Sequence, residues 1–181
     1  MFDAAERVLA HDGVSGLTSR AVTTEAGVAK GVMHRHFADF DIFIAELILD
    51  RAAQLDGAAS ELRDAAGAST VIDNLTDALN VVFSPLTVSV VALIITRDGL
   101  HARLGEAGAG RFPLIAEGSA MVTAYLTAEQ ALGRVAAAAD IPTLSHALIG
   151  SVHLLFTDRE SGSPDAEAVN RVVASIMLGA V

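Results

Sequence analysis

A short basic cluster surrounds the only lysine of this 181-residue chain, in "AGVAKGVMHRHF" at residues 26–37. Its potential hydrogen-bond donors are Lys30, His34, Arg35 and His36. Such groups bind phosphate and other anions through charge-assisted hydrogen bonds. The two histidines are two residues apart, so on a helix they point to different sides and make a poor metal chelate. The cluster therefore predicts an anion-binding surface, and we expect neither a metal nor another cofactor.

The positive charge is confined to this part of the chain. The whole chain has a net charge of −10, which argues against general nucleic-acid binding, because phosphate contacts need Lys and Arg. Residues 18–37 differ, with three Arg or Lys against Glu25 alone, a net charge of +2 before the histidines are counted. A basic face on an acidic body is typical of a small, focused contact with DNA.

Two short helices are expected before the basic cluster. Residues 2–12 place apolar side chains on one helical face, and Gly13 is suited to end that helix. Thr18 or Ser19 is suited to cap a second helix, which Gly27 then ends.

The cluster itself is expected on a third helix, from about Ala29 to Phe37. Met33 and Phe37 are i,i+4 neighbours that can face the core, while Gly31 and Arg35 lie nearly opposite. Gly31 has no side chain, so a phosphate or a base edge could approach the backbone closely there. Asp39 is a plausible N-cap of a fourth helix. Short helices joined by a glycine turn predict a helix-turn-helix.

The remainder of the chain also predicts helices. Thr70–Ser84 has a clean apolar stripe. Residues 86–99 are apolar and β-branched, which suits a strand or a buried helix, but no second strand candidate exists, so we favour a helix. We expect residues 105–110 to be a loop, Pro113 to about Thr127 a helix, and a short Ala-rich helix to end near Asp140.

Two further helices, residues 142–159 and a final one capped by Ser163 with Pro164 in its first position, complete an all-α fold. We divide the chain into a helix-turn-helix DNA-binding domain, residues 1–48, and a helical ligand-binding and dimerisation domain, residues 49–181. The wide apolar band of the final helix suggests that something covers it, although packing on its own core would also explain it.

Composition bears on the location of the protein. It has no Cys, which fits a reducing cytoplasm, and no signal peptide opens the sequence. The longest apolar run, residues 88–95, is far shorter than the ~20 residues of a membrane-spanning helix. We therefore expect a cytoplasmic protein without a membrane partner.

Catalytic patterns are missing from the sequence. It contains no Gly-x-Ser-x-Gly elbow, phosphate-binding glycine loop, His-Glu-x-x-His or paired thiols, and its carboxylates are scattered over ordinary helical surfaces. We expect no enzymatic activity.

Residues 2–50 resemble the DNA-binding domain of TetR-type transcriptional regulators, notably in "EAGVAKG" at 25–31 and "RHF" at 35–37. The resemblance implies a helical homodimer that binds double-stranded operator DNA and a small-molecule effector, and it suggests a repressor released by that ligand. Carried over by position, the DNA-facing residues are Thr18, Ser19, Lys30, Gly31, Val32, His34 and His36, with Arg20 and Arg35 as weaker candidates.

Three positions depart from the family pattern. Ala29 stands where the family usually has a capping Ser, His34 where it has Tyr, and Phe40 where it has a phosphate-holding Lys; no basic arm precedes residue 2. The alternative is therefore a helical dimeric adaptor or ligand-binding protein with a degenerate DNA-binding head.

The expected ligand contacts are mostly apolar, which suggests an apolar or amphipathic effector, although plain core packing would explain the same residues. They are Asn80, Phe83, Leu86, Val90, Ile94, Arg97, Met121, Tyr125, His146 and Phe156. The family forms its dimer with the last two long helices, and the residues expected at that interface are Leu144, Leu148, Val152, Leu155, Val169, Val172, Val173 and Ile176.

Overall fold

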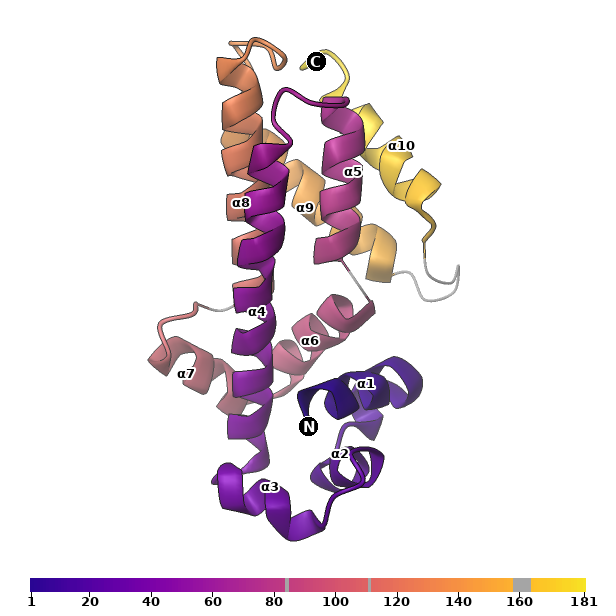
Figure 1. Ribbon diagram of the computed structural model, residues 1–181, viewed down its shortest axis with the longest axis vertical. Helices are drawn as coiled ribbons and strands as arrows, with labels where there is room; N and C mark the ends of the chain where they lie inside the picture. The colour runs from indigo at the N-terminus through magenta and orange to yellow at the C-terminus, as the bar shows by residue number, and fades with distance from the viewer. Residues whose placement is uncertain (84, 111, 158–163) are drawn as a thin grey trace. The chain divides into compact units, whose positions relative to one another are not determined.

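The computed structural model describes residues 1–83, 85–110, 112–157 and 164–181, without the side chains of residues 85, 86 and 98. Its helices are α1 (Phe2–Gly16), α2 (Ser19–Glu25), α3 (Lys30–His36), α4 (Phe40–Asp64), α5 (Val71–Val82), α6 (Pro85–Thr96), α7 (Asp98–Glu106), α8 (Pro113–Ala131), α9 (Ile141–Thr157) and α10 (Ala166–Met177) (Figure 1). The described ranges contain no strand, which confirms the all-α prediction. Residues 86–99 are helical as expected, except that α6 ends at Thr96 and a separate helix, α7, begins at Asp98.

Two compact units are interleaved along the chain. The first comprises Met1–Arg51 and Pro85–Pro113, and the second comprises Ala52–Ser84 and Leu114–Val181. α4 therefore begins in the first unit and ends in the second, while α6 and α7 belong with the amino-terminal helices. The functional boundary at residue 48 stays a prediction.

The first unit packs α1 against both α2 and α6. Val8 and Leu9 of α1 are buried, and α1 is kinked at Gly13, whose φ of 68° belongs to the left-handed region that glycine adopts without strain. Arg51 of α4 pairs with Glu6 of α1. Burial raises the pKa of this Glu6 carboxyl, and the Arg51 charge opposes that rise.

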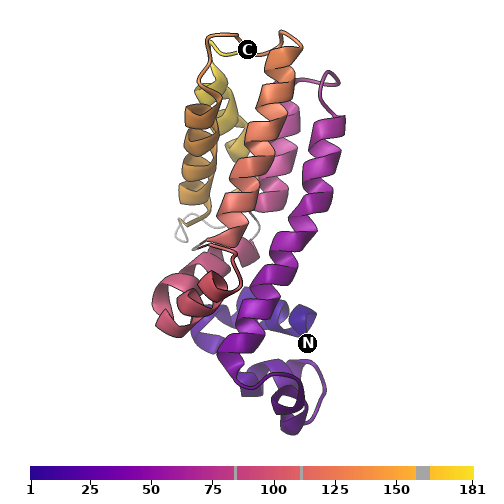
Figure 2. The ribbon, with the colours of Figure 1, turned by 90° about the vertical axis from the view of Figure 1, so that its left-hand side faces the viewer.

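In the second unit, α5 and α9 both pack against α10. The helices of this unit run side by side in Figure 2. Thr70 caps α5 by accepting a hydrogen bond from the Asp73 N–H at 3.0 Å, and the predicted stripe of α5 is buried at Leu75 and Leu79. Gly118 of α8 lies so close to Val82 that an added Cβ would meet its Cγ1 at 2.8 Å.

A buried polar network joins α5, α8 and the segment that follows α8. Glu129 is 0% exposed and accepts a hydrogen bond from the Tyr125 hydroxyl at 2.6 Å. Asn74 donates to that hydroxyl at 2.9 Å, and Arg134 lies 3.4 Å from the second Glu129 oxygen. Burial and the bond to Glu129 raise the pKa of Tyr125, so the phenol stays protonated and keeps donating.

Three details differ from the sequence prediction. α7 was not predicted, because Gly99 and Gly105 interrupt its pattern. The Ala-rich residues 132–140 are not helical, because Gly133 takes a φ of 73° and Gln130 donates to the carbonyls of residues 136 and 139. Asp165, rather than Ser163, is the N-cap of the last helix, and Ser163 lies outside the described residues.

Within the described ranges, no single helix is long and apolar enough to span a membrane; only α5 combined with residues 87–96, across a 50° bend, reaches that length and hydropathy. The same ranges hold no group of His, Asp and Glu side chains arranged to bind a metal ion.

Candidate nucleic-acid interface

α3 presents the basic cluster to solvent. Met33 faces inward and is 1% exposed, whereas Lys30, Gly31, His34, Arg35 and His36 are exposed and Val32 is half-buried. The helical spacing that buries one apolar side chain thus leaves the donors on the outer face, as the sequence predicts. No atom of the chain lies within 4 Å of the position that a Cβ on Gly31 would take, so the backbone is open there.

α2 is the other half of the turn. Its N-cap is Thr18, whose hydroxyl oxygen accepts a hydrogen bond from the Ala21 N–H at 3.1 Å. Thr18 and Arg20 are exposed, and Ser19 is half-buried. Gly27 ends this segment with a φ of 66°, as expected for the glycine of a helix-turn-helix. α3 has no equivalent cap, since its N-cap position is Ala29.

An aromatic cluster holds the end of α3 against α1 and α4. The ring of Phe37 meets that of Phe43 edge-on, with centroids 5.0 Å apart, and Phe2 lies 5.4 Å from Phe43. Phe40 stacks on the same Phe43 ring at 5.7 Å. Because aromatic pairs with this geometry are favourable beyond the area they bury, the cluster fixes α3 at its carboxyl end.

Two ion pairs join α7 and its N-cap residue to the start of α4, and no sequence pattern predicted them. Arg97 pairs with Asp41 at 2.8 Å and its guanidinium carbon lies 5.6 Å from the Phe40 ring centroid. Arg103 pairs with Asp39, which also caps α4 by accepting from the Ile42 N–H at 2.8 Å. The partners are 56 and 64 residues apart, so no local pattern indicates them.

Comparison with known proteins supports this reading of the amino-terminal helices. Residues 2–39 match the family model described as "Bacterial regulatory proteins, tetR family". The match spans the helix-turn-helix just described. This segment of the chain is similar to the tetR family.

Solved structures show that the likeness in fold extends well beyond the matched segment. A transcriptional regulator from Rhodococcus sp. Rha1 is 20% identical, with a TM-score of 0.72 over 99% of this chain and 95% of that one. FadR from Bacillus subtilis, solved in complex with stearoyl-CoA, is 15% identical, with a TM-score of 0.71 over 99% and 97%. A TetR-family regulator from Mesorhizobium loti is 18% identical, with a TM-score of 0.65 over 98% and 93%. Among curated protein sequences, none matches significantly.

The expected ligand contacts are divided between the two units. Val90, Ile94 and Arg97 belong to the first unit, where the two aliphatic side chains are buried and Arg97 is paired with Asp41. The other described members belong to the second unit: Asn80, Phe83, Met121, Tyr125, His146 and Phe156. The side chain of Leu86 lies outside the described residues.

Within the second unit, only part of this set gathers in one place. Phe83 is buried, and its ring centroid lies 6.2 Å from that of Phe156 and 5.9 Å from that of His153. His153 was not among the predicted contacts. Its Nδ1 is buried without a hydrogen-bond partner, and burial lowers its pKa. Tyr125 is engaged by Glu129, and His146 is exposed.

Two grooves in the second unit follow the carboxyl half of α4. One, of about 210 Å³, lies between α4 and α8 and includes Met121. The other, of about 200 Å³, lies between α4 and α5 and includes Val81. Neither is lined by the aromatic side chains that were expected to contact a ligand.

The residues expected at the dimer interface fall into two groups. Leu148, Val152, Val169 and Val173 are 0% exposed within a single subunit. The half-buried ones are Leu144, Leu155, Val172 and Ile176. Since a fully buried side chain offers no surface to a partner, only the second group is available for contact, together with Leu154, which is 69% exposed.

Proposed function

We propose that this chain is a sequence-specific DNA-binding transcriptional repressor that works as a homodimer in the cytoplasm. The observation that carries the proposal is the outer face of α3, where Lys30, His34 and Arg35 are exposed over the buried Met33. In a helix-turn-helix, the second helix enters the major groove and its outward side chains meet base edges and phosphates. The charge of residues 18–37 suits that contact, because Glu25 is their only carboxylate and it is paired with Arg7 at 2.6 Å.

Fluorescence anisotropy tests this function directly. The probes are the intergenic duplex upstream of the gene and an unrelated duplex of equal length, each at low and moderate salt. We expect tight, salt-sensitive binding to the upstream duplex alone, because released counterions make phosphate contacts weaken as salt rises. Lys30→Ala and His34→Ala should lose that binding. Equal, weak binding to both duplexes would instead favour an adaptor with a degenerate head.

In the proposed dimer, the interface sets the distance between the two helix-turn-helix units. Two recognition helices about one DNA turn apart read a near-palindrome, and linkage makes the pair bind more tightly than either head alone. We place the interface on the exposed and half-buried positions of α9 and α10. Leu154→Glu should give a monomer in light scattering after size-exclusion chromatography. Val81→Glu is the matched control, since Val81 is also exposed, at 56%, but lies on α5. A Leu154→Glu dimer would place the interface elsewhere.

An apolar or amphipathic small molecule is the proposed effector. The half-buried rings of His153 and Phe156, which lie beside the buried Phe83, offer it an aromatic surface in the second unit. The likeness to FadR, which was solved with stearoyl-CoA, makes a long-chain acyl-CoA the first compound to test. To release the repressor, the ligand must bind the conformation with the wrong head spacing more tightly than the DNA-bound one. Stearoyl-CoA should therefore lower the anisotropy of the preformed complex, whereas free coenzyme A should not.

A further inference from the structure

We propose that Arg103 of α7 contacts a backbone phosphate of the bound DNA beside α3. This residue lies far outside the helix-turn-helix in the sequence, and nothing in the sequence pattern assigns it to DNA binding. The inference rests on the proposed function, since it adds a contact to the same DNA-binding surface.

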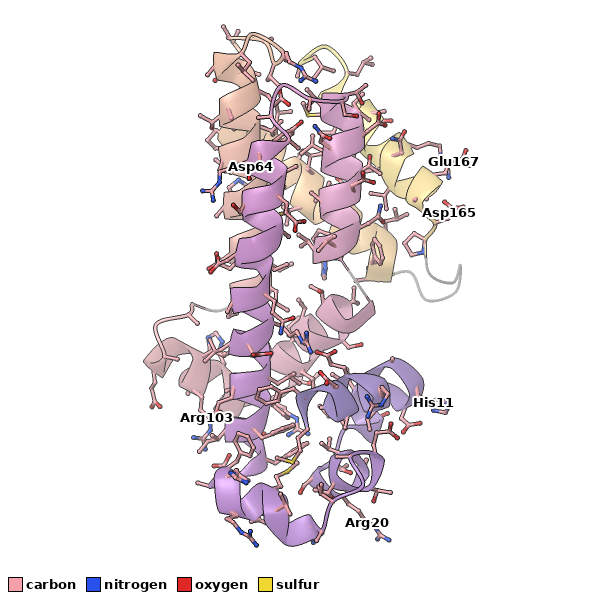
Figure 3. The ribbon with its side chains drawn as sticks, viewed as in Figure 1. His11, Arg20, Asp64, Arg103, Asp165 and Glu167 are labelled. Carbon is pink, nitrogen blue, oxygen red and sulfur yellow. The ribbon has the colours of Figure 1, made fainter. Side chains whose placement is uncertain are left out.

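The position of Arg103 is the first support. It pairs with Asp39, which lies three residues beyond the end of α3 and caps α4. Figure 3 shows Arg103 beside the start of α4, near the carboxyl end of α3, whereas Arg20 lies near the amino end of α3. A helix in the major groove has a phosphate backbone on each side of it, so side chains that flank α3 are placed to meet those backbones.

The chemistry of the pair is the second support. Within the described part of the chain, the only side-chain partner of Arg103 is Asp39, through Nη2. A guanidinium has five N–H donors in a planar fork, so Nε and Nη1 keep donors for a phosphate. The Arg103 side chain is 34% exposed, and that of Asp39 is 46% exposed. Asp39 thus orients the guanidinium without removing it from solvent.

Charge balance at the start of α4 is the third support. Asp39 and Asp41 follow α3 directly and would repel a phosphate within a Debye length of about 8–10 Å. Arg97 neutralises the charge of Asp41, and its guanidinium also lies over the Phe40 ring. These two contacts leave it less free to reach DNA. Arg103 compensates Asp39, and within the described residues no aromatic ring contacts its guanidinium. With both carboxylates paired, Asp39 and Asp41 do not offset the positive charge of residues 18–37.

The salt dependence of binding tests the contact. Each phosphate contact contributes about 0.9 to the slope of log K against log salt. Two subunits bring two Arg103 side chains, so Arg103→Gln should reduce the slope by about 1.8. The ratio of the Kd at about 200 mM salt to that at about 50 mM should then be about 12-fold smaller than for the wild-type chain. Arg103→Lys keeps the charge and should keep most of the slope.

A matched control separates this contact from a general charge effect. Arg63→Gln removes an equal charge from an exposed position of α4 in the second unit, away from α9 and α10. It should leave the slope unchanged. If Arg103→Gln gives the same slope as Arg63→Gln, the proposed phosphate contact is refuted.

Asp39→Ser distinguishes the phosphate contact from a structural tether between α7 and α4. Serine keeps the helix cap but releases Arg103 and removes a negative charge. A phosphate contact predicts that Asp39→Ser binds DNA as tightly as the wild-type chain, or more tightly. A tether predicts the same loss in Asp39→Ser as in Arg103→Gln, which would overturn the inference. Far-UV circular dichroism checks that both variants are folded.

The failure of this inference can be told apart from the failure of the proposed function. If Lys30→Ala loses binding and Arg103→Gln keeps the full salt slope, the regulator stands and the Arg103 contact falls. If the wild-type chain shows no salt-dependent preference for the upstream duplex, both fall together.

Discussion

Gly31 allows stability and DNA affinity to be changed in opposite directions. It lies in the first turn of α3, and a Cβ added there would meet no atom of the chain within 4 Å. Replacing a helical glycine with alanine stabilises a helix by up to about 1 kcal/mol. Gly31→Ala should therefore raise the melting temperature, by up to about 2–4 °C for a chain of this size.

The same methyl group should weaken DNA binding. If DNA approaches the Gly31 backbone closely, the methyl must be accommodated in a packed contact, which costs about 1–3 kcal/mol. Two heads on one operator double that cost to at least about 2 kcal/mol, a loss of about 30-fold in affinity. The added methyl leaves the charge unchanged, so the loss should appear at every salt concentration.

The assay pairs thermal denaturation with fluorescence anisotropy. Gly57→Ala is the matched control, because Gly57 is an exposed glycine of α4 with no atom within 4 Å of a built Cβ. It belongs to the second unit and should gain stability without any change in Kd. If Gly31→Ala gains stability and binds DNA as Gly57→Ala does, Gly31 does not meet DNA and the reasoning for the outer face of α3 is refuted.

Three further predictions concern the elements that support the site. Gly118→Ala should lower the urea midpoint, since a Cβ 2.8 Å from Val82 Cγ1 costs about 1–3 kcal/mol against a helix gain of about 1 kcal/mol. In a Val82→Ala background, where that methyl is absent, Gly118→Ala should no longer lower the midpoint. An equal midpoint for the wild-type chain and Gly118→Ala would contradict the tight packing. Ala29→Ser should supply the missing cap of α3, worth about 1 kcal/mol, and slow amide hydrogen exchange there about fivefold; equal exchange rates in both chains would contradict it. Because burial lowers the pKa of His153 from its ordinary 6.5, its contribution to stability is present above pH 6.5 and is lost as the pH falls below it. His153→Phe should reduce that loss in urea titrations at about pH 7.5 and about pH 5.5, and an identical loss in both chains would count against it.

Local signals predicted much of the amino-terminal head. Thr18, Gly27 and Asp39 act as caps and breaks in the structure as their residue types predict, because capping and left-handed backbone depend on one side chain and its nearest neighbours. The burial of Met33 below an exposed Lys30 follows from helical spacing alone.

Local signals were weaker where a side chain competes for the backbone hydrogen bonds of a helix or where packing overrides helix propensity. Residues 132–140 have the composition of a helix, yet the structure shows turns there. The Gln130 side chain donates hydrogen bonds to the carbonyls of Ala136 and Ala139. α7 was missed because its two glycines lower its helix propensity, which the surrounding packing overrides.

The sequence by itself determined that this chain is helical, that it opens with a helix-turn-helix and that the donors of that motif face outward. All three depend on the spacing and type of residues within a few turns. Only the tertiary structure decided that α6 and α7 belong to the amino-terminal unit, and that Arg97 and Arg103 neutralise the first turn of α4. It also decided which apolar residues of α9 and α10 are buried in the core of the chain itself. The physical reason is the same in each case: pairing between residues more than 50 positions apart depends on how the chain folds back, and no local periodicity encodes that return.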